Sequence, residues 1–133
     1  MKLRAANRAG AAPHAHPGPL AGMRVLELAQ IMAGPTCGML LADMGADVIK
    51  VEKLPGGDDA RGYREPLVNG VSAPFIMLNR NKRGIALDLK QAAGRDVLLR
   101  MVCDVDVLTE TTAAARSKSS ASATTCSRGR IRA

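Results

Sequence analysis

The chain has 133 residues, of which 47% are apolar and 23% charged, with one Phe, one Tyr and no Trp, which allows one small domain without a base-stacking platform. Its net charge of +7 resides at the ends, since residues 20–110 hold 11 basic and 12 acidic residues, whereas residues 111–133 hold five basic and no acidic ones. This distribution argues against a nucleic-acid-binding function, because such proteins gather basic residues on one folded face.

The first predicted unit is a strand, a helix and a second strand. Residues 23–28 form a short apolar run, which predicts a strand. Gly34-Pro35 then opens a helix, because Pro is favoured at the first helical position, and Gly45 ends it as a C-cap. Residues 48–51 predict a parallel strand that completes a right-handed βαβ unit. The helix carries an apolar stripe of Met39, Leu40, Leu41 and Met44.

The second half of the chain repeats this pattern after a long interruption. Residues 54–81 are charged and rich in Gly and Pro, which predicts a functional loop in place of a packed element. A strand at 85–89, a helix at 91–101 and a strand at 105–108 follow. The pattern predicts the α/β class, with a Rossmann-like parallel sheet and flanking helices. The tail, residues 111–133, lacks periodicity and is expected to be disordered.

The chain predicts neither a membrane segment nor a metal site. Residues 1–19 lack an apolar stretch and are expected to be a disordered extension, and no part of the sequence approaches the roughly 18 apolar residues that span a bilayer. The three cysteines are widely spaced and have no His at ligand spacing, which excludes a disulfide framework and a zinc site. We therefore expect a cytoplasmic protein without a bound metal. The cysteines are Cys37, Cys103 and Cys126.

Four motifs occur in a fixed order: AGP at 33–35, LADMGADVIKVE at 41–52, NRNKRGIALDLK at 79–90 and DVLTE at 106–110. With them the chain resembles the N-terminal part of the family III CoA-transferases, a group that includes formyl-CoA transferases, carnitine CoA-transferases and α-methylacyl-CoA racemase. The resemblance covers about residues 20–110 and implies a partial N-terminal domain. It further implies CoA transfer between an acyl-CoA and a carboxylic acid, in an interlocked homodimer.

Coenzyme A carries a diphosphate and a 3′-phosphate, so its site needs cations, backbone N–H groups and an apolar slot. The resemblance implies that Met32 and Ala33 approach the coenzyme through the main chain of the first turn. It implies that Lys53 contacts phosphate where the family usually has Arg, with a point charge in place of a planar fork. The remaining expected contacts are a nucleotide-binding segment and the basic pair before it: Leu87, Asp88, Leu89 and Lys90, with Lys82 and Arg83.

In this family an aspartate attacks the thioester and forms a mixed anhydride, which is covalent catalysis. The resemblance places that aspartate downstream of Asp88, Asp104 and Asp106, so we expect no catalytic residue in this chain and an inactive, truncated fragment. After Glu110 the sequence departs from the family. If one nucleotide was lost after that codon, restoring the reading frame gives a family-like continuation for suitable codons, which predicts a frameshifted product. Transferase and racemase chemistry remain alternatives.

Two other functions are weaker alternatives. Glu52 ends the second strand where a dinucleotide-binding protein has its ribose-binding acid, but the preceding turn, AQIMAGPTCG, lacks the GxGxxG fingerprint. A non-enzymatic basic interaction protein acting through residues 111–133 would bind polyanions in a salt-dependent way. The ordered motifs favour the CoA-transferase interpretation over both.

Overall fold

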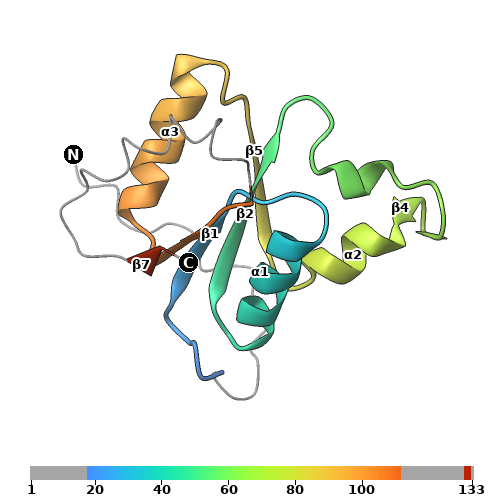
Figure 1. Ribbon diagram of the computed structural model, residues 1–133, viewed down its shortest axis with the longest axis horizontal. Coiled ribbons are helices and arrows are strands. Elements are labelled where there is room, and N and C mark those ends of the chain that lie inside the picture. The colour runs from blue at the N-terminus through green and yellow to red at the C-terminus, as the bar shows by residue number, and fades with distance from the viewer. Residues whose placement is uncertain (1–17, 112–130, 133) are drawn as a thin grey trace.

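The structure, a computed structural model, describes residues 18–111 and the backbone of residues 131–132. Five parallel strands form one sheet in the order β5-β2-β1-β6-β7, and two short antiparallel strands form a separate hairpin (Figure 1). The predicted α/β class with a parallel sheet and flanking helices is confirmed. The elements are β1 (Arg24–Glu27), α1 (Ala33–Asp43), β2 (Asp47–Lys53), η1 (Asp59–Gly62), β3 (Leu67–Val68), β4 (Val71–Ser72), α2 (Ala73–Asn79), β5 (Arg83–Leu87), α3 (Ala92–Cys103), β6 (Val107–Thr109) and β7 (Ile131–Arg132).

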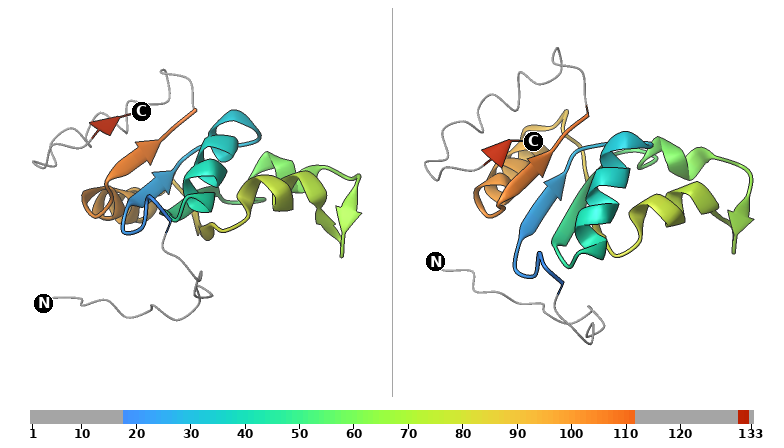
Figure 2. Two further views of the ribbon diagram at one scale, coloured as in Figure 1. Left: turned by 90° about the horizontal axis from the view of Figure 1, so that it is seen from below. Right: turned by 60° about the horizontal axis from the view of Figure 1, so that its bottom comes forward.

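The two faces of the sheet are covered by different helices (Figure 2). On one face, Leu26 and Val51 are buried beneath apolar side chains of α3. On the other face, Val25 and Val48 pack against Ala42 at the end of α1. Because successive side chains of a strand point to opposite faces, β1 and β2 contribute to both layers.

Helix α1 packs on the sheet mainly through small residues, and Leu41 is the member of its predicted apolar stripe that packs against the core cluster on this face. Leu40 is 52% exposed and Met44 40% exposed, whereas the buried positions of the helix are Gly34, Pro35, Gly38 and Ala42. A Cβ atom at Gly38 would lie only 1.8 Å from Oε2 of Glu27 on β1. The spacing of four residues places the small residues on one face, and their size brings α1 close to the strand.

The prediction that residues 54–81 contain no packed element is wrong. This segment contains η1, the β3–β4 hairpin and α2, which lies beside α1 and extends away from the sheet (Figure 1). The start of α2 follows ordinary capping chemistry, since the Ser72 hydroxyl oxygen accepts from the backbone N–H of Phe75 at 3.4 Å and Pro occupies the first turn. This capping signal is only a few residues long and lies within a Gly- and Pro-rich stretch, so the sequence analysis did not predict the helix.

Other element boundaries differ by a few residues. The strand expected at 85–89 is β5 at Arg83–Leu87, because the backbone turns at Asp88, whose Oδ1 accepts from the N–H of Lys90 at 3.0 Å. Residues 1–17, 112–130 and 133 lie outside the described residues, so the extension and tail assigned there stay predictions. Within the tail, Ile131–Arg132 pairs with β6 as β7.

Candidate functional site

Several of the predicted site residues meet at the carboxyl edge of the sheet, the upper edge in Figure 1. Lys53 ends β2 and is the register partner of Leu87, which ends β5, and the turn at Asp88, Leu89 and Lys90 follows directly. Met32 is the N-cap of α1, 64% exposed, and Ala33 begins the helix. Ligands of open parallel sheets bind at this edge, and the role of these residues in binding coenzyme A stays a prediction.

A cleft of about 410 Å³ lies beside the ends of β2 and β5. Position 57 in the wall of the cleft requires glycine, because Gly57 has φ +73° and a Cβ atom there would lie 2.5 Å from Oε2 of Glu52. The absence of a side chain keeps this wall open. The cleft is lined by Glu52, Lys53, Leu54, Gly56, Gly57, Arg61, Gly84, Ile85 and Ala86.

Two cations line the cleft, and they are held to different degrees. The guanidinium of Arg61 donates from Nε (2.6 Å) and Nη2 (2.8 Å) to the two carboxylate oxygens of Glu52 and stacks on the ring of Phe75 at 3.7 Å. These hydrogen bonds hold the pKa of Glu52 below its ordinary value. Lys53 pairs with Asp59, and both side chains are about half exposed. Since exposed ion pairs contribute about 1 kcal/mol or less, Asp59 holds Lys53 only weakly.

The structure does not bring Lys82 and Arg83 to the cleft. The Nζ atom of Lys82 is 2.8 Å from Oε2 of Glu27, 2.8 Å from the carbonyl oxygen of Pro35 and 3.0 Å from Oδ1 of Asn79, and its side chain is 2% exposed. Burial lowers the pKa of Lys82, and Glu27 offsets only part of this effect. Arg83 pairs with Asp47 at the amino ends of the strands.

A buried group of four charged side chains lies beneath α1 and α2, and the sequence analysis missed it. We call this group the ionic cluster: Glu27, Lys50, Asp58 and Lys82. The Nζ atom of Lys50 is 2.8 Å from Oε1 of Glu27 and 2.7 Å from Oδ2 of Asp58, with all three side chains 2% exposed or less. The two cations balance the two anions. The sequence feature that could have revealed the ionic cluster was the presence of charged residues within β1 and β2, since central parallel strands are ordinarily apolar on both faces.

Asp58 connects the ionic cluster to the turn between β1 and α1. Its Oδ1 accepts from the backbone N–H groups of Ile31 (3.0 Å) and Ala60 (2.9 Å). Burial alone would raise the pKa of Asp58, but hydrogen bonds from Lys50, Ala60 and Ile31 outweigh it and hold the pKa below its ordinary value. Ile31 has φ +68°, a conformation that costs a β-branched residue about 1–3 kcal/mol.

Within residues 18–111, the structure places no group of three or more His, Cys, Asp or Glu side chains suited to a metal ion. None of the helices found there has the length and apolar character to cross a membrane.

The fold and the cleft define an α/β protein with a cleft at the carboxyl edge of a parallel sheet. A family profile described as "CoA-transferase family III" matches residues 20–125. The chain belongs to this family. The match extends past Glu110, the residue after which the sequence analysis expected the resemblance to stop.

Individual relatives agree with this assignment. The chain is 47% identical over 98 residues to a succinate–glutarate CoA-transferase of Agrobacterium fabrum, covering 69% of this chain and 24% of the relative. It is 48% identical over 91 residues to a formyl-CoA:oxalate CoA-transferase of Rhodopseudomonas palustris, covering 68% and 21%. The crystal structure of a CAIB/BAIF family protein from Brucella suis matches with a TM-score of 0.65 and 44% identity, covering 70% and 25%. The chain thus spans about a quarter of the length of these relatives.

Proposed function

We propose that this chain forms the CoA-binding edge of a family III CoA-transferase, an enzyme that moves CoA between an acyl-CoA thioester and a carboxylic acid. The observation that carries the proposal is the cleft beside the ends of β2 and β5, which Lys53 lines. The segment at 87–90 follows β5 and the α1 N-terminus follows β1, so both lie at the same carboxyl edge of the sheet. Family membership supplies the reaction class.

The chemistry of the edge suits a phosphorylated nucleotide. Lys53 and Lys90 supply positive charge, and Lys53 is half exposed. The N–H groups in the first turn of a helix have no intrahelical partner and favour anions, so Met32 and Ala33 begin a surface that suits the diphosphate. Leu89, which is 38% exposed, offers apolar contact for the adenine.

We assign no nucleophile within residues 18–111. Of the carboxylates beside the cleft, Glu52 is bound by Arg61 and Asp59 is paired with Lys53. In the proposed reaction an aspartate carboxylate attacks the thioester carbonyl, the carbon–sulfur bond breaks, and CoA leaves as the thiolate. The described residues therefore serve binding, and transfer is proposed for the whole protein.

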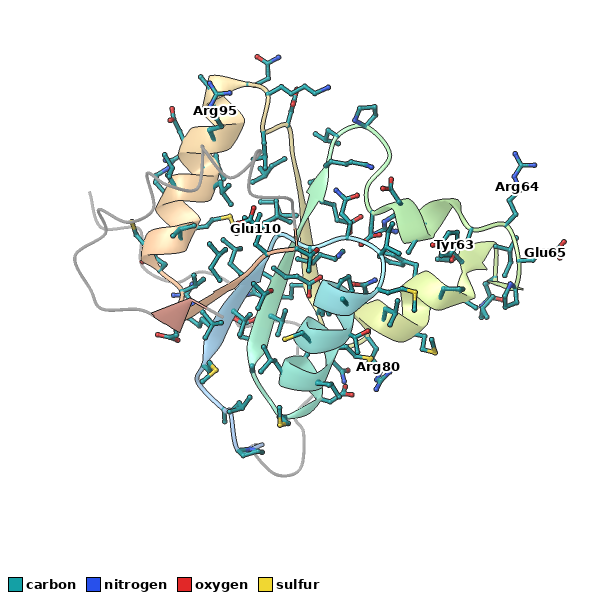
Figure 3. The ribbon with its side chains drawn as sticks, viewed as in Figure 1. Tyr63, Arg64, Glu65, Arg80, Arg95 and Glu110 are labelled. Carbon is teal, nitrogen blue, oxygen red and sulfur yellow. The ribbon has the colours of Figure 1, made fainter. Side chains whose placement is uncertain are left out.

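Calorimetric titration of the 133-residue protein with CoA and with pantetheine, which lacks all phosphates, tests the proposal. Lys53→Ala is expected to weaken CoA binding about tenfold, the value of one hydrogen bond to a charged group, and to leave pantetheine binding unchanged. Lys53→Arg should retain CoA binding, because the charge remains. Arg80→Ala is the control, since Arg80 pairs with Asp43 at the foot of α2 (Figure 3). Equal CoA affinity of Lys53→Ala and wild type would contradict the proposed site.

We also propose that the whole protein is a homodimer whose interface includes the β3–β4 hairpin and the outer face of α2. The β3–β4 hairpin and the outer face of α2 expose apolar side chains, and contiguous exposed apolar surface marks interaction sites. Tyr63, Arg64 and Glu65 lie at the hairpin end of α2, and the side chains of Arg64 and Glu65 point away from the sheet (Figure 3). The exposed apolar residues are Leu67, Val68, Val71, Ile76 and Met77.

A further inference from the structure

Three buried side chains from separate segments hold the backbone of the turn between β1 and α1. Lys50 of β2 donates to the carbonyl oxygen of Ala29 at 2.8 Å. Asp58, which precedes η1, accepts from the N–H of Ile31 at 3.0 Å. Lys82, which precedes β5, donates to the carbonyl oxygen of Pro35 at 2.8 Å. The backbone is therefore held at two points between β1 and α1 and at a third point in the first turn of α1.

The three holding side chains are themselves fixed. Glu27 binds Lys50 through Oε1 and Lys82 through Oε2, each at 2.8 Å. Lys50 also lies 2.7 Å from Oδ2 of Asp58. The backbone N–H of Asp58 donates to Oε2 of Glu52 at 3.0 Å. A displacement of one member therefore disturbs the contacts of the others.

Stability alone does not account for the ionic cluster. Buried ion pairs can often be replaced by apolar residues of similar size without loss of stability. An unconstrained turn would also move Ile31 out of its left-handed conformation, which β-branched residues disfavour. Strained backbone persists where its surroundings fix it and is concentrated at ligand sites. Here the surroundings are charged groups aimed at backbone atoms of the turn.

We propose that Lys50, Asp58 and Lys82 are positioning residues that hold Ile31 in its left-handed conformation and thereby present the main chain of Met32 and Ala33 to CoA. None of the three is required to touch the ligand. The identity of the ligand rests on the proposed function, whereas the fixing of the turn rests on the contacts above. Preorganisation of this kind increases affinity, because the turn is already ordered and no binding free energy is spent on ordering it.

A charge-balanced double variant separates positioning from stability. Lys50→Met with Asp58→Ala removes one cation and one anion, so Glu27 and Lys82 remain as a pair. In hydrogen exchange of the whole chain, the Ile31 amide is expected to exchange at least about tenfold faster relative to the amides of β2, because its charged acceptor is gone. Val51→Ala, which truncates a buried side chain on the α3 face, is the control and should leave that ratio unchanged.

The same variants are then titrated with CoA. The double variant is expected to bind CoA about tenfold more weakly than Val51→Ala. Asp58→Asn keeps an oxygen acceptor for the Ile31 amide, so in hydrogen exchange it should retain most of the protection of that amide. An unchanged Ile31 exchange ratio in the double variant would overturn the proposal, as would CoA affinity equal to that of Val51→Ala. If wild type itself binds no CoA, the proposed function fails, while the exchange ratio still decides whether the cluster fixes the turn.

Discussion

Gly38→Ala is expected to destabilise the protein, although alanine is the better helix former. In a helix whose surface is free, this change stabilises by about 1 kcal/mol. At position 38 the new Cβ atom would lie 1.8 Å from Oε2 and 3.0 Å from Cδ of Glu27. Glu27 is 0% exposed and is held by Lys50 and Lys82, so it has no free space into which to move.

The magnitude follows from the contacts of Glu27. Displacing a buried, paired carboxylate costs about 3–5 kcal/mol, and the helix gain offsets about 1 kcal/mol. The free energy of unfolding is therefore expected to fall by about 2–4 kcal/mol. Urea unfolding followed by circular dichroism measures this change. With a slope of about 1 kcal/mol per M urea, the midpoint should fall by about 2 M or more.

Two comparisons isolate the cause of that loss. Gly62→Ala is the matched control, since a Cβ atom there meets nothing within 4 Å, and its stability should change by about 0.5 kcal/mol or less. In a Glu27→Ala background the carboxylate is absent, so Gly38→Ala should cost at least about 1 kcal/mol less than in wild type. A Gly38→Ala protein as stable as wild type would refute the close packing of α1 on β1.

The remaining predictions concern charge and association. The folded-state pKa values of Asp58 and Glu52 lie below their ordinary values of 3.8 and 4.5. The stability that these carboxylates contribute is therefore fully present above the ordinary values and should be lost as the pH falls below them and through the folded-state values, and Asp58→Asn should reduce this loss in urea titrations. Arg61→Ala should cost about 1.5–3 kcal/mol in urea unfolding because it removes two hydrogen bonds to Glu52, whereas Arg83→Ala, which breaks an exposed ion pair, should cost about 1 kcal/mol or less. If the hairpin mediates dimerisation, Leu67→Lys should lower the mass of the protein in light scattering, and an unchanged mass would contradict that interface.

The parallel sheet could be predicted because its signals are local. The apolar runs that became β1 and β2, and the Gly-Pro and Gly45 signals around α1, each act within a few residues. The packing face of α1 could not be predicted from hydrophobicity, because Gly38 meets the sheet only through its lack of a side chain. Helix α2 was missed because it has seven residues, and short helices depend on tertiary contacts for their stability.

The candidate site could be predicted only where its residues lie in local sequence motifs. Lys53 ends β2 and Lys90 lies in the turn after β5, and the resemblance to the family predicted both as site residues. The roles of Lys50 and Asp58 depend on contacts between residues far apart in the sequence, such as the pair of Glu27 with Lys82. Those contacts exist only once the strands are in register.

The ionic cluster also limits how this protein can diverge. Loss of one member leaves a buried charge without a partner, which costs about 3–5 kcal/mol, a large part of the stability of a small domain. An apolar substitution at Lys50 therefore becomes tolerable only together with one at Glu27 or Asp58. Across an alignment of many descendants, these positions should change in concert or remain fixed, whereas Leu26 and Val51 on the α3 face should exchange freely among aliphatic residues.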